Sequence, residues 1–219
     1  STIPGSGTAV AGAPNTVCQP GQDYTSDGKT VIFDAGNDTS QNFDVRVCRD
    51  LVFEGLPPAN ETFRAQLTNP TGGGVPQGTG VLGNSAVADA AIVDDDAAPT
   101  LSIACTAVPE NAGSVQVCTV TQNITSSLNT TFSFATGGQN DTATANVDYT
   151  STASTGSIPA GSTTASIIVP IIDDNIDEPN ETFIVTLSAP LNATISTGVG
   201  TVTITDNEPN TTFAINNVA

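Results

Sequence analysis

The chain has 219 residues, with 22 acidic and 4 basic side chains, a formal net charge of −18, and no His, Met or Trp. Without His, imidazole acid–base catalysis, Ser–His or Cys–His nucleophile pairs and histidine-held zinc or haem are excluded. Four basic residues cannot neutralise a phosphate backbone, so nucleic acid is excluded as a partner, and an anionic membrane surface would repel the chain. The composition therefore favours a soluble protein whose small partner is a cation or whose role is mechanical.

Patterning predicts an all-β chain. Only 12% of the residues are charged, and Val, Ile and Thr, which fit pleated half-buried strands, are abundant. Polar and apolar residues alternate over 166–172, 183–187 and 201–205, whereas no stretch of ten residues keeps a helical apolar period. No apolar stretch is long enough to span a membrane, so no direct membrane insertion is expected. The length fits one or two domains made of short strands and Gly-, Pro-, Asn- and Asp-rich turns.

The cysteines predict structural disulfides. Cys18, Cys48, Cys105 and Cys118 allow three pairings, of which a two-module division favours Cys18–Cys48 and Cys105–Cys118. Residues 110–113 have the composition of a hairpin turn, which would bring the second pair face to face. A redox pair or a metal thiolate cluster is the alternative, but neither pair has CxxC spacing. Structural disulfides imply an oxidising compartment.

N-glycosylation sequons give a second indication of compartment. All eight have Thr at the third position, and chance alone would produce about four in a chain so rich in Ser and Thr. We therefore expect secretion to the extracellular space or cell surface, with N-linked glycans on some of these sites. The acceptors are Asn37, Asn60, Asn123, Asn129, Asn140, Asn180, Asn192 and Asn210.

Four motifs occur twice along the chain, which indicates two copies of one module. They are D-Y-T-S at 23–26 and 148–151, A-G at 35–36 and 160–161, N-E-T-F at 60–63 and 180–183, and a polar, mainly acidic triplet at 94–96 and 206–208. We expect one module over 1–98, a second over 99–209, and an extra strand over 210–219. The short Ala-Pro link at 97–99 leaves little slack between the modules.

These motifs resemble the Calx-β module. The resemblance rests on D-Y-T, then I-I-D-D-x-x-x-E-x-x-E-T-F, then a final strand that ends in an acidic triplet, and in the second copy it extends over about residues 100–208. It also includes V-P-E-N-A-G at 108–113. The resemblance implies two tandem immunoglobulin-like antiparallel β-sandwiches. Such modules occur in extracellular adhesion and matrix proteins and in the regulatory loop of sodium–calcium exchangers.

The first copy departs from this pattern at its start. Residues 1–12 align just ahead of D-Y-T, so the first two strands of that sandwich are missing, which leaves open sheet edges. Residues 212–216 align with the first strand of the second copy. We expect either a longer tandem array, or a head-to-tail assembly in which this strand is donated to the next subunit. The assembly strand carries Thr212, Phe213, Ala214 and Ile215.

Carboxylates in the turns of the second copy predict a calcium site. Calcium takes six to eight oxygen ligands, the resemblance implies that these turns meet at one end of the sandwich, and mutual repulsion among carboxylates favours a divalent cation. The competing interpretation is that acidic residues gather in turns because they tolerate turn geometry. The candidates are Glu110, Asp148, Asp173, Asp174, Glu178, Glu181, Asp206 and Glu208.

The first copy has a weaker version of this set. The alignment places Cys48 and Arg49 where the second copy has Asp173 and Asp174, and the early Glu is missing. We expect the guanidinium of Arg49 to take the place of an ion among the remaining carboxylates. These are Asp23, Glu54, Glu61, Asp94, Asp95 and Asp96.

Together these features predict a secreted structural or adhesive protein. It would be a repeat-module subunit of an extracellular filament or surface stalk, joined head to tail or to flanking modules of its own chain, with calcium as a candidate stiffening ion. The alternative is a pair of calcium-binding regulatory or sensor modules. A carbohydrate-binding module is a third hypothesis, which 8 Phe, 2 Tyr and no Trp disfavour, because sugars need aromatic stacking platforms. An enzyme is not expected.

Overall fold

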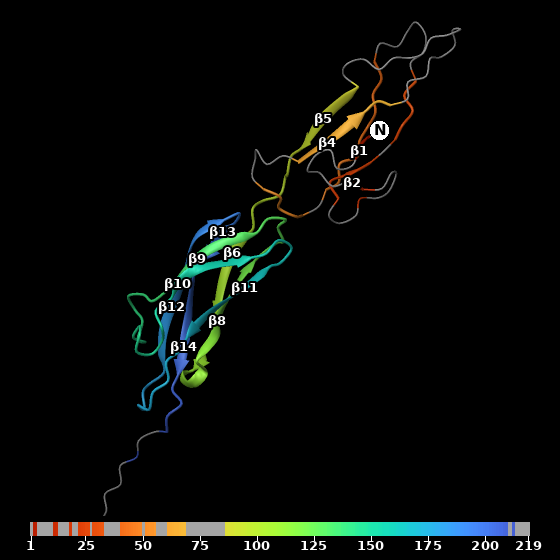
Figure 1. Ribbon diagram of the computed structural model, residues 1–219. Coiled ribbons are helices and arrows are strands. Elements are labelled where there is room, and N and C mark those ends of the chain that lie inside the picture. The colour runs from red at the N-terminus through yellow and green to blue at the C-terminus, as the bar shows by residue number, and fades with distance from the viewer. Residues whose placement is uncertain are drawn as a thin grey trace, which may run out of the picture. The chain divides into compact units, whose positions relative to one another are not determined.

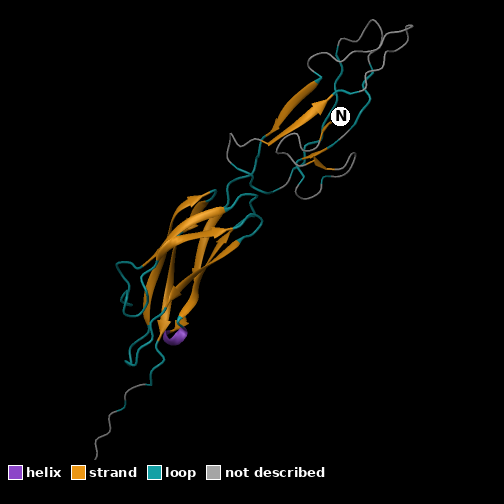
Figure 2. Cartoon of the chain, viewed as in Figure 1, coloured by secondary structure: helices purple, strands orange, loops and turns teal. Residues whose placement is uncertain are grey.

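The computed structural model divides into two compact units, Ser1–Asp96 and Ala97–Ala219 (Figure 1). It describes residues 2–3, 11–12, 18, 22–26, 28–32, 40–49, 51–55, 61–68, 86–209 and 212. These residues form strands, turns and loops, with one 3-10 turn, η1, at Glu110–Ala112 (Figure 2). No helix in this part of the chain is long and apolar enough to cross a membrane. The all-β prediction is confirmed.

The second unit is an immunoglobulin-like sandwich of two sheets. One has the strand order β10-β9-β12-β14-β7 and the other β11-β8-β6-β13. All neighbouring strands are antiparallel except the pairs β14–β7 and β13–β6. The strands are β6 (Thr100–Cys105), β7 (Val108–Pro109), β8 (Ser114–Gln122), β9 (Thr130–Thr136), β10 (Ala153–Ile158), β11 (Thr164–Pro170), β12 (Glu181–Leu191), β13 (Thr194–Thr197) and β14 (Val199–Thr205).

Alternation along these strands builds the core. Phe183, Val185 and Leu187 of β12 point inward, as do Val202 and Ile204 of β14, and all five are buried. The period of two places every second side chain on the same face of a sheet. The three stretches with alternating sequence coincide with β11, β12 and β14, so these predictions are confirmed.

The segment between Cys105 and Cys118 does not form a simple hairpin. The two cysteines are register partners in β6 and β8, and their disulfide joins Cα atoms 4.0 Å apart. Between them the chain leaves this sheet, pairs as β7 with β14 of the other sheet, and turns through η1. Gly113, with φ +64°, then returns the chain to β8, because glycine adopts this left-handed conformation without steric penalty. The predicted turn therefore exists, but it carries a strand that changes sheet.

The first unit has β1 (Thr2–Ile3), β2 (Ala11–Gly12), β3 (Tyr24–Thr25), β4 (Glu61–Gln66) and β5 (Val87–Ile92). One sheet has the order β1-β4-β5 and the other pairs β2 with β3. A disulfide joins Cys18 to Cys48. This pairing and the Cys105–Cys118 pairing of the second unit are the two that the sequence favours.

Matching ladders show that the two units are copies of one module. Glu61 pairs with Ile92 as Glu181 pairs with Ile204, and Tyr24 bridges Val47 as Tyr149 bridges Ile171. In both units the tyrosine stacks on a phenylalanine: the ring centroids of Tyr24 and Phe63 are 4.7 Å apart, and those of Tyr149 and Phe183 are 4.0 Å apart.

This register corrects the sequence alignment by one residue. The amide of Cys48 donates to the carbonyl of Asp23 at 2.8 Å, as the amide of Ile172 donates to that of Asp148 at 2.9 Å. Cys48 therefore corresponds to Ile172, and Arg49 to Asp173. The predicted alignment was wrong because the first unit has one more residue between the tyrosine and its bridge partner.

The first unit lacks counterparts of β6 and β8 among its described residues. Residues 40–46, which by the same register correspond to β11, form no described strand. Phe43 is 40% exposed, whereas Ile167, at the equivalent place in β11, is 1% exposed. No strand among the described residues of this unit pairs with the segment 40–46. Of the predicted assembly strand only Thr212 is described, and it is exposed; Phe213, Ala214 and Ile215 lie outside the described residues.

Candidate metal centre

Seven carboxylates of the second unit form one continuous cluster. Glu110 comes from η1, Asp148 from the turn before β10, Asp174 and Glu178 from the loop after β11, Glu181 from the start of β12, and Asp206 and Glu208 from the segment after β14. They form three groups, each with one oxygen per residue within 4.8 Å of the others. The groups are Glu110, Asp206 and Glu208; Glu110, Asp174 and Glu178; and Asp148, Glu178 and Glu181.

Glu110 and Glu178 each belong to two groups, so these two side chains link the whole cluster. The eighth candidate, Asp173, belongs to none of them, although its charge acts on Glu208. The structure thus brings seven of the eight predicted carboxylates together and leaves Asp173 outside.

Hydrogen bonds to the backbone fix the loops that carry these groups. Asp206 Oδ1 accepts the amide of Glu178 at 3.2 Å, and Asp174 Oδ1 accepts the amide of Ile176 at 2.7 Å. Asp148 Oδ2 accepts the amide of Thr144. Because each of these carboxylates keeps further oxygen lone pairs, the bonds orient the side chains without saturating them.

Asn207 joins the segment after β14 to η1. Its Oδ1 accepts the amide of Asn111, the residue after Glu110, at 3.0 Å. The sequence shows Asn207 only as the middle residue of an acidic triplet, and this pattern does not predict the bond. An amide oxygen can accept a hydrogen bond from a backbone amide as a carboxylate does, but without adding negative charge. An Asn between two acidic residues is therefore the sequence feature that could have indicated such a bond.

Burial and mutual repulsion raise the pKa values of the clustered glutamates. The pKa of Glu110 rises from 4.5 to about 7, first because the side chain is buried, with 5% exposed, and then because of the charges of Glu208 and Asp174. Burial also raises the pKa of Glu181 to about 7, followed by its hydrogen bond with Asp148. The pKa values of Glu178 and Glu208 are raised by burial and by neighbouring carboxylates.

No basic residue of this unit offsets these charges. The four basic residues of the chain are Lys29, Arg46, Arg49 and Arg64, all in the first unit. Like charges gathered at short range disfavour ionisation unless an opposite charge is supplied. The cluster therefore needs protons or a cation.

The donor set and the space available fit a single hard cation. A cavity of about 10 Å³ lies among Glu110, Asp148, Glu178, Pro179, Glu181, Ile204 and Asp206. This volume is about that of one water-sized sphere, so it suits a monatomic ion. Glu208 Oε2 is buried and accepts no hydrogen bond from any residue that the structure describes. Carboxylate oxygens are the preferred ligands of Ca²⁺.

The first unit keeps a smaller cluster. Oxygens of Asp23, Glu54 and Glu61 lie within 4.8 Å of one another, in the arrangement of Asp148, Glu178 and Glu181. The backbone confirms that Glu54 corresponds to Glu178: its amide donates to Asp94 Oδ2 at 2.8 Å, as that of Glu178 does to Asp206. In the sequence, an insertion that carries Gly55 and two prolines separates Glu54 from Glu61, so the spacing to E-T-F is longer in the first unit.

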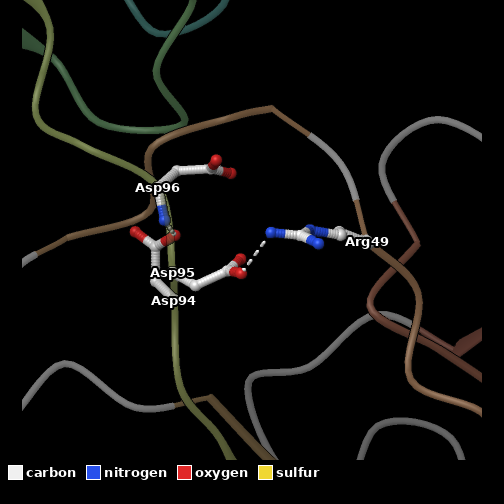
Figure 3. A network of polar contacts seen from close by, with 4 residues as sticks. All are labelled: Arg49, Asp94, Asp95 and Asp96. Carbon is white, nitrogen blue, oxygen red and sulfur yellow. Dashed lines mark hydrogen bonds and ion pairs between the residues drawn. The ribbon is translucent and has the colours of Figure 1, made fainter.

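In the acidic triplet of the first unit, Asp94 and Asp95 already bind groups of the protein itself. Asp94 Oδ2 also accepts the amide of Gly55 at 3.2 Å, and its Oδ1 accepts the amide of Asp96 at 3.0 Å. Arg49 Nη2 lies 2.9 Å from Asp95 Oδ2, and both side chains are mostly exposed. Figure 3 shows the guanidinium reaching Asp95 while the carboxylate of Asp94 points away from it.

This placement refines the prediction for Arg49. The guanidinium neutralises Asp95 at the rim of an open pocket of about 300 Å³, which Asp23, Glu54, Asp94 and Asp96 also line. Arg49 thus lines the same pocket as the carboxylates it was expected to join, and Asp95 is the one with which it forms an ion pair at 2.9 Å. In the register, Arg49 stands at the position of Asp173, which lies outside the compact groups of the second unit.

Five of the eight predicted glycan acceptors lie among the described residues. Asn123, Asn129, Asn140 and Asn180 are exposed and Asn192 is partly buried. Asn123 Oδ1 accepts the amide of Thr100 at 2.7 Å, and Asn129 Oδ1 accepts that of Ala160 at 2.9 Å, so these residues also close turns. Asn37, Asn60 and Asn210 lie outside the described residues.

The chain matches one domain family and is similar to several solved structures. The Calx-beta domain family matches residues 15–96 and 94–208, whereas no curated protein matches the chain. The structure of an apo-form Calx CBD1 domain is 24% identical with a TM-score of 0.44, over 50% of this chain and 97% of that one. CBD12 from CALX1.2 is 26% identical with a TM-score of 0.45, over 49% and 44%.

The calcium binding domain CBD12 of CALX1.1 is 25% identical with a TM-score of 0.44, over 49% of this chain and 45% of that one. The match thus spans less than half the length of the two CBD12 structures. The two consecutive family matches cover most of the sequence and fall on the two units found by geometry. The chain belongs to the Calx-beta domain family and contains two consecutive Calx-beta domains.

Proposed function

We propose that this chain is a calcium-binding module pair in which the second module holds the ion and the first module folds without one. The observation that carries the proposal is the cluster of seven carboxylates, five of which line an ion-sized cavity, in a unit without a basic residue. Membership of the Calx-beta domain family supports it.

Five side chains that line the cavity would hold the ion: Glu110, Asp148, Glu178, Glu181 and Asp206. A bound divalent cation would supply the positive charge that the cluster lacks. The side chains come from η1, the turn before β10, the loop after β11, the start of β12 and the segment after β14. Backbone amides already hold the carboxylates of Asp148 and Asp206. Neutralising the repulsion among all five side chains would stiffen five segments at once. Calcium binding would thereby make this end of the module more rigid.

Thermal unfolding of the full chain with and without calcium tests this proposal. A ligand specific to the folded state, at a hundred times its Kd, stabilises it by about 2.7 kcal/mol, so the unfolding midpoint should rise. Glu178→Gln should reduce the rise, because Glu178 belongs to two of the three groups. Asp177→Asn is the matched control: it removes the same charge from the neighbouring residue, which belongs to no group. An unchanged midpoint at millimolar calcium would rule out the proposal.

We also propose a secreted setting in which the chain assembles with copies of itself or with flanking modules. The disulfide in each unit supports an oxidising compartment. The exposed Phe43 and Val47 support a missing strand partner, because the equivalent Ile167 and Ile171 are buried in the core of the second unit, where β11 pairs with β8. In this proposal the segment 211–219 supplies a strand to another copy.

Deleting residues 211–219 tests the assembly. Light scattering and electron microscopy of the secreted chain should show oligomers or filaments that the deletion abolishes. A truncated chain that assembles like the full one would contradict donation of this strand. Mass spectrometry before and after glycosidase treatment of the same material would show whether the sequons carry glycans.

A further inference from the structure

The disulfide of the second unit closes the base of the segment that carries Glu110. Cys105 is the last residue of β6, and its register partner in β8 is Cys118. Just beyond the bridge, the amide of Thr106 donates to the carbonyl of Val117 at 3.0 Å. From there the chain crosses to the other sheet as β7 and enters η1. Both ends of the excursion that delivers Glu110 are therefore tied together covalently.

The same bridge packs against the strand that delivers Asp206 and Glu208. A Cβ atom added to Gly200 of β14 would lie 2.3 Å from Cys105 Sγ, so the sulfur occupies the space above this glycine. Five residues later β14 ends at Thr205, directly before Asp206. The disulfide thus contacts β14 while joining β6 to β8. β14 leads directly to Asp206, and β6 leads through β7 to Glu110.

Repulsion within the cluster acts against this excursion. Glu110 is 5% exposed and faces the charges of Glu208, Asp174 and Asp206. Non-covalent contacts hold the segment in place. Val108 is buried in the core, β7 forms a two-residue ladder with β14, and the hydroxyl of Thr205 donates to the carbonyl of Val108 at 3.3 Å. Beyond β7 there are the Asn111–Asn207 bond of 3.0 Å and the amide of Ile171 donating to the carbonyl of Gly113 at 2.9 Å. A cross-link across the loop reduces the number of conformations that the segment can reach when it is pushed outward.

We infer that the Cys105–Cys118 disulfide is a positioning element for Glu110, which keeps β7 and η1 in the cation-binding arrangement before the ion arrives. The inference rests on the proposed calcium site. It adds that the calcium affinity of this site depends on whether the Cys105–Cys118 bridge is oxidised. Loss of the bridge lowers the affinity of the second module for calcium, while the sandwich core remains folded.

A double-mutant cycle, measured by calorimetric calcium titration of the full chain, tests this inference. Cys105→Ala/Cys118→Ala should raise Kd about tenfold, as expected when a group that orients a ligand is removed. In a Glu110→Gln background the same change should have little effect, because the residue that the bridge positions no longer offers a carboxylate. Cys18→Ala/Cys48→Ala removes the other bridge and should leave the affinity of this site unchanged. If Cys105→Ala/Cys118→Ala does not fold, Cys105→Ala/Cys118→Val keeps the volume of the buried Cys118.

A measurement without metal separates positioning from general stability. Amide hydrogen exchange in EDTA should become faster over residues 106–113 when the bridge is removed and remain unchanged in β9 and β12. Equal calcium affinity with and without the bridge, or the same loss in the Glu110→Gln background, overturns the inference. Absence of calcium binding by the oxidised wild-type chain instead overturns the proposed function, and the inference with it.

Discussion

Glu110 and Glu181 make the second module sensitive to protons as well as to cations. Each has its pKa raised to about 7 by burial and by neighbouring carboxylates. A carboxyl group with such a pKa is partly protonated at neutral pH when no cation is present. Protons and calcium therefore compete for the same oxygens, and acidification should weaken calcium binding.

The pH dependence of stability in EDTA follows from the same shifts. The folded pKa of Glu110, about 7, lies above the ordinary value of 4.5, so between these two pH values the folded state binds more protons than the unfolded state. The free energy of unfolding therefore falls as pH rises through this window, by roughly 3 kcal/mol for a fully expressed shift of this size.

Thermal melts in EDTA at pH 8 and pH 5.5 measure this effect. The midpoint of the second module should be higher at pH 5.5, which is the reverse of ordinary acid denaturation, and Glu110→Gln should reduce the difference. A midpoint that falls on acidification over this range would contradict the electrostatic description of the cluster.

Among the strands, the described parts of the two modules differ most beside β11, because no described strand of the first module corresponds to β8. In the second module β11 lies at the edge of its sheet, paired with β8, and its inward residues Ile167 and Val169 are fully packed. In the first module the equivalent residues 40–46 form no described strand, and Phe43 is 40% exposed. The same alternating pattern thus has different packing in the two copies.

Truncation of these side chains should show the difference. Ile167→Ala should lower the free energy of unfolding of the second module by about 2–5 kcal/mol, as expected for a fully buried aliphatic side chain. Phe43→Ala should lower that of the first module by only about 1–2 kcal/mol, because 40% of this residue is already exposed to water. Urea unfolding of both variants provides the comparison. A loss at Phe43 as large as that at Ile167 would mean that the ring is covered.

The sequence predicts a site residue reliably where its motif also contains a residue of the core. Asp148 and Glu181 were identified because D-Y-T and E-T-F place them beside Tyr149 and Phe183, whose stacked rings form part of the core. Glu110 was found by resemblance, but its sheet-changing strand was not, because Val108 pairs with Ile204 across most of the module. The sequence alignment of Arg49 was wrong by one residue, because the first unit has one extra residue between Tyr24 and Val47 and no local motif shows where it is inserted.

As a two-module chain, the protein distributes its charge unevenly. All four basic residues lie in the first unit, where Arg49 pairs with Asp95 and Arg64 with Asp89. These exposed pairs contribute little stability, but they reduce the negative charge of that unit. The second unit has ten acidic side chains and no basic one, so a divalent cation should affect the two modules differently.

Calorimetry of the full chain should resolve this asymmetry. We expect two unfolding transitions, of which calcium raises only that of the second module, because Asp94 and Asp95 of the first are already engaged by backbone amides and Arg49. Glu178→Gln, which lies in the second module, identifies the responsive transition. Equal calcium shifts of both transitions would indicate a functional site in each module.

The stacked aromatic pair at the base of each cluster has an optical consequence. The chain contains two tyrosines and no tryptophan, and the structure places one buried tyrosine in each module, Tyr24 after Asp23 and Tyr149 after Asp148. Each module therefore contains its own natural fluorophore, next to a carboxylate of its cluster. Replacing Tyr24 with Phe leaves a single emitter, so the ultraviolet emission of the unlabelled, full-length chain would then report on the second module alone.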